Sequence, residues 1–128
     1  MNILDENISD SQRRLLSSWR IYTRQIGFEL GKKGMSDDEI IPLLHQLSHP
    51  TFYTRDSDFY HPKLCHPGYC LVYLDVRKDE VATFIRRFLR HKSFKTRTYR
   101  MGTVVRVSHI GLAVWHLYAL HEDLIAWA

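Results

Sequence analysis

The sequence lacks the features that mark secreted, membrane and fibrous proteins. It has only two cysteines, Cys65 and Cys70, too few for a disulfide framework. No apolar run approaches the roughly 18 to 20 residues of a membrane span, and the start, MNILDENISD, carries acids where a signal peptide carries basic residues. There is no internal repeat and no low-complexity segment. We therefore expect a cytoplasmic protein that makes no membrane contact.

The composition is that of a folded globular domain. Of the 128 residues, 45% are hydrophobic and 25% are charged, close to the averages of such domains, which excludes disordered and fibrous classes. At about 100 to 200 residues per domain, this length predicts one domain spanning residues 1–128. We place its core at about residues 1–91 and expect a basic C-terminal extension over residues 92–128.

Charge is distributed unevenly along the chain. Residues 1–60 hold seven Lys and Arg against nine Asp and Glu, whereas residues 61–128 hold eleven against five. An acidic part joined to a basic part suits a polyanion that is bound by one surface and processed by a carboxylate cluster on another. Two ordinary solvated surfaces would give the same pattern.

Strand and helix signals alternate through residue 91. Apolar or β-branched runs at residues 2–4, 21–23, 51–54 and 70–74 predict short strands. Capping residues Ser9 and Ser36 predict helices over 10–19 and from 37 onward, the latter containing Pro42, and a third helix is predicted over 79–91. Residues 103–107 and 112–118 predict two strands joined by a turn. The pattern favours a three-layer α/β/α fold with a mainly parallel central sheet and a C-terminal β-hairpin.

Four aspartates follow predicted strands or begin a predicted helix. Asp5 follows the first strand, Asp56 and Asp58 follow the third, and Asp37 begins the second helix. Ligands of open parallel sheets bind outside the carboxyl ends of the strands, so we expect these acids at one edge. Carboxylates gathered there would suit Mg²⁺ or Mn²⁺. Taken singly, each acid also fits a helix N-terminus or a turn.

The segments around these acids resemble a known family. Leu4-Asp5-Glu6-Asn7, Gly34-Met35-Ser36-Asp37-Asp38-Glu39-Ile40 and Thr54-Arg55-Asp56-Ser57-Asp58-Phe59 are similar to signatures of the minimal PIN-like nucleases. This branch of the PilT N-terminus superfamily often supplies the toxin of toxin–antitoxin pairs. The resemblance covers residues 2 to about 90. It implies a PIN-like fold in which Asp5, Asp37, Asp56 and Asp58 bind metal and are catalytic, with the Thr54 hydroxyl supporting them.

The activity implied by this resemblance is that of a Mg²⁺- or Mn²⁺-dependent endoribonuclease. Bound cations would activate water for hydrolysis of an RNA phosphodiester and neutralise the leaving oxygen. Arg55 lies between the strand and the acid pair and could contact a phosphate. We further predict nucleic-acid contacts along the basic stretch, at Arg86, Arg87, Arg90, Lys92, Lys95, Arg97 and Arg100.

Several alternatives stay open from the sequence. A non-catalytic module that binds nucleic acid or a protein could use the same fold and basic stretch. The group His61, Cys65, His66 and Cys70 invites a zinc site, although its spacing fits no usual pattern, and the pair Asp56 and Asp58 also fits an aspartyl-phosphate phosphatase. The apolar residues 111–120 predict a protein partner, either an antitoxin or a second copy in a homodimer.

Overall fold

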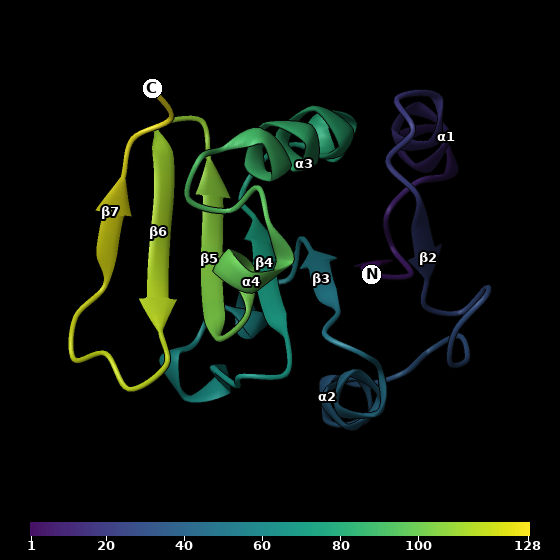
Figure 1. Cartoon of the computed structure of the whole chain (residues 1–128). Helices are drawn as coiled ribbons and strands as arrows, with labels where there is room; N and C mark the ends of the chain where they lie inside the picture. The colour runs from purple at the N-terminus through teal and green to yellow at the C-terminus, as the bar shows by residue number, and fades with distance from the viewer.

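A single sheet of seven strands runs through the molecule. The strands are β1 (Asn2–Leu4), β2 (Thr23–Gln25), β3 (Thr51–Thr54), β4 (Cys70–Leu74), β5 (Thr103–Ser108), β6 (Gly111–His116) and β7 (Asp123–Ile125). In the computed structural model, which describes residues 1–128, their order is β2-β1-β3-β4-β5-β6-β7 (Figure 1). The first five strands of this order, β2, β1, β3, β4 and β5, are parallel to one another. Strand β6 is antiparallel to β5, and β7 is antiparallel to β6. The predicted α/β class and mainly parallel sheet are confirmed.

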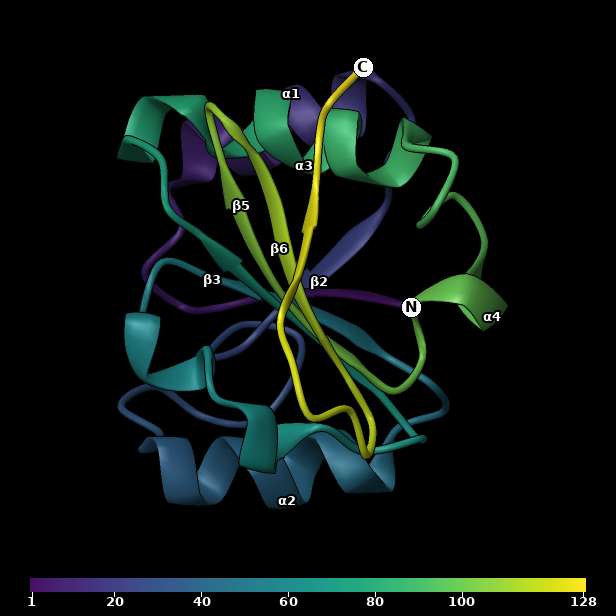
Figure 2. The same cartoon turned by 90° about the vertical axis from the view of Figure 1, so that its left-hand side faces the viewer.

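Helices cover both faces of this sheet. Helices α1 (Asp10–Ser18) and α3 (Val81–Arg90) lie on one face, and α2 (Asp37–Gln46) lies on the other (Figure 2). Short helical turns follow β3 and β4, namely η1 (Ser57–Phe59), η2 (Pro62–Leu64) and η3 (Lys78–Glu80), and α4 (Arg97–Arg100) precedes β5. None of the helices is long and apolar enough to cross a membrane.

The hydrophobic core is divided by the sheet into two clusters. The larger has 18 buried residues and includes Leu16 of α1 and Phe84 of α3, while the smaller has 9 and includes Ile40 and Leu44 of α2. Strands buried on both faces read as continuous apolar runs, which is why Cys70–Leu74 could be predicted as a central strand.

The helices begin where their capping residues predict. The Ser9 hydroxyl accepts a hydrogen bond from the Gln12 amide, and the Ser36 amide donates to Glu39 Oε1. Helix α2 runs on through Pro42, which removes one hydrogen bond of the ladder without ending the helix.

Several elements differ from the sequence prediction, among them the short helix α4, which was not predicted. Strand β2 begins at Thr23 instead of residue 21, because Ile21 still belongs to the C-terminal cap of α1. Its amide donates a hydrogen bond to the Leu16 carbonyl oxygen, and the preceding residue, Arg20, has a left-handed backbone with φ 62°. Strand β7 was not predicted at all. Its three residues include the exposed Leu124 and lack a buried alternating pattern.

Candidate metal centre

The acidic residues meet at the point where the strand order reverses. From β1 the chain passes through α1 to β2 on one side, whereas β3 lies on the other side of β1. Such a reversal opens a crevice at the carboxyl ends of the two neighbouring strands. Asp5 follows β1 and Asp56 comes two residues after the end of β3, so both lie at this crevice.

Three carboxylates come together here. Oxygen atoms of Asp37, Asp56 and Asp58 all lie within 4.8 Å of one another. Asp37 is the first residue of α2, and Asp56 Oδ1 accepts a hydrogen bond of 2.9 Å from the Asp58 amide at the start of η1. The turn after β3 therefore holds two of the acids in place, and the helix start brings in the third.

Asp5 lies beside this group and is held more firmly. Its Oδ2 accepts a 2.7 Å hydrogen bond from the Thr54 hydroxyl, and its Oδ1 accepts one of 2.8 Å from the Glu6 amide. The Thr54 oxygen also accepts a hydrogen bond from the Asp56 amide at 3.0 Å. Thr54, which is fully buried, thus links the acid after β1 to the acid after β3.

Electrostatic repulsion connects all four aspartates. Desolvation raises the pKa of Asp37, and the charges of Asp56, Asp58 and Asp5 raise it further. Desolvation also raises the pKa of Asp5, and the charge of Asp56 adds to this rise. Hydrogen bonds from the Thr54 hydroxyl and the Glu6 amide lower the pKa of Asp5, but the net change is a rise. The cluster therefore carries more negative charge than its surroundings neutralise.

The donor set fits a hard divalent cation. Carboxylate oxygens are preferred by Mg²⁺ and Mn²⁺, and two oxygens on opposite sides of one Mg²⁺ lie about 4.2 Å apart, at roughly 2.1 Å each from the ion. The separation of up to 4.8 Å among Asp37, Asp56 and Asp58 is closed by small side-chain rotations or by one intervening water. Asp5, predicted as a fourth ligand, lies outside this group of three.

Gln25 supports the site and was not predicted from the sequence. Its side chain is buried, and Nε2 donates to the carbonyl oxygens of Asp5, Glu6 and Ile8, at 3.0, 3.3 and 2.7 Å. This amide fixes the loop that carries Asp5. No sequence pattern marks it, because its role depends on carbonyl groups about 20 residues away in the chain.

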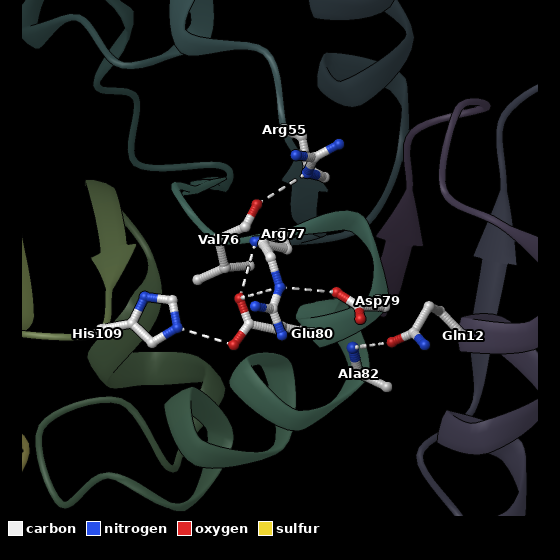
Figure 3. A network of polar contacts seen from close by, with 8 residues as sticks. All are labelled: Gln12, Arg55, Val76, Arg77, Asp79, Glu80, Ala82 and His109. Atoms are coloured by element: carbon white, nitrogen blue, oxygen red, sulfur yellow. Dashed lines mark hydrogen bonds and ion pairs between the residues drawn. The ribbon is translucent and has the colours of Figure 1, made fainter.

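Arg55 is the basic residue that lies at the cluster. With Asp5 and Asp56 it lines an open hollow of about 330 Å³, and its Nε donates to the Val76 carbonyl oxygen at 3.0 Å (Figure 3). That bond anchors the guanidinium to the loop after β4. In the same network Glu80 accepts hydrogen bonds from the Arg77 amide and pairs with His109.

The other predicted nucleic-acid contacts lie elsewhere. Arg86 and Arg87 of α3 stack over Trp19 and Trp127, at 3.6 and 4.2 Å from the ring centroids. Because α3 returns the chain from the carboxyl end of β4 to the amino end of β5, its last residues point away from the carboxylates. Four basic residues at or beyond the end of α3 are exposed near the amino ends of the strands. They are Arg90, Lys92, Lys95 and Arg97.

Arg100 does not fit its predicted role. It is buried, its Nε donates to Thr51 Oγ1 and one of its terminal nitrogens donates to the Phe94 carbonyl oxygen. These bonds tie α4 to the first residue of β3, at the end of the sheet opposite to the aspartates. Arg100 is therefore a structural residue and not an accessible phosphate contact.

The predicted zinc group is not assembled. Cys70 is buried beside the Thr103 hydroxyl, and Cys65 donates to the Trp115 carbonyl oxygen. The Nδ1 atoms of His61 and His66 accept hydrogen bonds from Lys63 and Gly68 amides in separate turns. Asp37, Asp56 and Asp58 are the only set of three or more His, Cys, Asp or Glu residues in the chain that could hold a metal ion.

The apolar C-terminal segment is only partly hidden. Residues 111–114 are buried in the sheet, whereas Ile110, Tyr118, Leu120 and Leu124 are largely exposed. A second hollow, of about 370 Å³ and mainly apolar, lies among β5, β6 and β7, away from the carboxylates. It holds no cluster of ionisable groups.

Comparison of the chain with protein families, curated proteins and solved structures gives no match. The functional argument therefore rests on the geometry of the residues at the crevice and on the sequence segments that carry them.

Proposed function

We propose that this protein is a metal-dependent ribonuclease of the PIN-like type that hydrolyses RNA phosphodiester bonds. The observation that carries the proposal is the meeting of Asp37, Asp56 and Asp58, with oxygens within 4.8 Å, at the reversal of strand order. Three such acids repel one another, and a bound cation would relieve that repulsion. The segments that bear them are those that resemble the PIN-like nucleases.

The residues at the crevice have distinct roles in this proposal. Asp37, Asp56 and Asp58 would hold Mg²⁺ or Mn²⁺, and Thr54 and Gln25 fix Asp5 and its loop beside them. When bound, the cation lowers the pKa of water and neutralises charge on a leaving oxygen. Arg55 has its Nε on the Val76 carbonyl oxygen, which leaves its terminal nitrogens to orient a phosphodiester over the hollow.

The test is cleavage of an end-labelled single-stranded RNA by the purified protein. We expect cleavage in Mg²⁺ or Mn²⁺, none in EDTA, and a loss of about 100-fold or more in Asp56→Asn. Asp38→Asn is the matched control, because it removes the same charge from an exposed residue outside the group of three acids. Cleavage that persists in EDTA, or in Asp56→Asn at the parent rate, contradicts the assignment.

A non-catalytic binding module is the alternative function. It is favoured if the parent protein binds RNA but leaves it intact in every cation tested. The exposed apolar residues around β7 support a further proposal from the sequence, a protein partner that is an antitoxin or a second copy of the chain. Light scattering of the pure protein at micromolar concentration measures the second of these directly.

A further inference from the structure

The loop that joins β2 to α2 presents an aromatic ring and free cations to solvent. Phe28 is 59% exposed, so its ring is accessible to a ligand. The Nζ atom of Lys33 lies over this ring, 5.3 Å from its centroid. An exposed aromatic ring beside a cation is the arrangement with which proteins bind single-stranded nucleic acid.

This loop is attached to the carboxylate site at both ends. At its start, the buried Gln25 side chain bonds the carbonyl oxygens of the loop that carries Asp5. Further on, the Gly34 amide donates to Glu6 Oε1 at 2.7 Å, and two residues later Ser36 caps the helix that begins with Asp37. The loop therefore lies against the residue next to Asp5 and leads directly into Asp37.

Gly27 shows how closely the loop approaches the site. Its φ of +86° is in the left-handed region, and a Cβ atom placed on it would lie 3.3 Å from Glu6 Oε2 and 3.2 Å from Lys33 Cγ. Glu6, Lys33 and the backbone before Phe28 are thus neighbours. The Phe28 ring therefore belongs to a loop that contacts Glu6, the residue after Asp5.

Two cations of this region have no ion pair within the chain. Lys33 of the loop and Arg24 of the edge strand β2 are exposed and have no carboxylate within 4.0 Å. Lys32 reaches only a loose exposed contact of 3.6 Å with Glu39. In contrast, Arg100 of the predicted basic stretch is buried.

We propose that residues 27–35, which we call the β2–α2 loop, form the docking site for the single-stranded RNA that enters the carboxylate crevice. One unpaired base stacks on Phe28, and Lys33 contacts the adjoining phosphate. This inference rests on the proposed ribonuclease function and names the surface that presents its substrate. It moves the substrate path from the predicted basic stretch after α3 to the opposite end of the sheet, beside β2.

The experiment measures binding of a fluorescently labelled oligouridine by anisotropy, in an Asp56→Asn background that prevents cleavage. Phe28→Ala is expected to weaken binding about tenfold, as for loss of one stacked base, and Phe28→Tyr to retain it. Lys33→Gln should reduce the slope of log affinity against log salt by about 0.7. Tyr99→Ala and Lys95→Gln are matched controls, because Tyr99 is 56% exposed and both residues lie near the amino ends of the strands.

Each outcome decides the inference. Tenfold weaker binding by Phe28→Ala, with the Tyr99→Ala and Phe28→Tyr values near the parent, supports it. The inference is overturned if Phe28→Ala binds RNA within twofold of the parent, or if Tyr99→Ala loses as much affinity as Phe28→Ala. In either case, RNA cleavage by the protein that retains Asp56 would still support the ribonuclease function. If that protein neither binds nor cleaves the RNA, both proposals fall.

Discussion

Removing one charge from the aspartate cluster should stabilise the protein when no divalent cation is present. Asp56→Asn is the informative change, because asparagine keeps the side-chain oxygen that accepts from the Asp58 amide and loses only the charge. At 4.8 Å each pair repels by about 0.9 kcal/mol in water. Asp56 makes two such pairs, and screening at physiological salt reduces their sum to about 1 kcal/mol.

The expected change is large enough to measure by thermal unfolding. For 128 residues, an unfolding entropy of about 2.1 cal/mol/K per residue converts 1 kcal/mol into about 4 °C. In EDTA we therefore expect the Tm of Asp56→Asn to lie about 4 °C above that of the parent. Mg²⁺ at ten times a millimolar Kd should then raise the Tm of the parent by about 5 °C, since it adds about 1.4 kcal/mol.

Differential scanning fluorimetry in EDTA, MgCl₂ and MnCl₂ gives both comparisons. Asp38→Asn serves as the control that removes one charge outside the group of three acids, and it should keep the cation response. The reasoning fails if Asp56→Asn is less stable than the parent in EDTA, or if the Tm of the parent does not respond to either cation. The second result would remove the main support for a metal site.

Three further predictions concern residues that stabilise the fold, one beside the site and two at the opposite end of the sheet. Gln25→Leu should destabilise by about 2 kcal/mol in urea unfolding, because it leaves the buried Ile8 carbonyl group unpaired, whereas the exposed Gln46→Leu should change little. Arg100→Ala should cost about 2 kcal/mol in the same assay and the exposed Arg90→Ala less than about 0.5 kcal/mol. Burial raises the pKa of Cys70 from 9.0 to about 12, so this thiol should not react with a thiol reagent in the native protein. The stability of the fold should fall as the pH rises above about 9, because there the thiol ionises only in the unfolded chain.

The sequence supports some elements better than others for physical reasons. The run Cys70–Leu74 and the apolar stripe of α3 are long enough to show the spacing of buried side chains that is typical of a strand or of a helix. Their secondary structure could therefore be predicted from that spacing. Strand β7 and helix α4 have three and four residues, which is too few for any periodicity. Their positions depend on neighbours that only the folded sheet provides.

The candidate site divides in the same way. The acids after β1 and β3 could be placed on one edge because parallel strands share the direction of their carboxyl ends. Gln25 could not be recognised, since the carbonyl groups that it bonds come from a different loop. Arg100 was misassigned because a basic residue in a basic stretch carries no mark of its burial beside Thr51.

The direction of α3 also explains why the basic stretch and the aspartates do not share a surface. A helix that crosses between parallel strands begins at the carboxyl edge of the sheet and ends at the amino edge. Arg87 and Arg90 occupy the last turn of α3, where cations are stabilised by the helix dipole. Their placement therefore has a structural cause that requires no ligand. A polyanion at the aspartates would need cations at the carboxyl edge, where Arg55 lines the hollow together with Asp5 and Asp56.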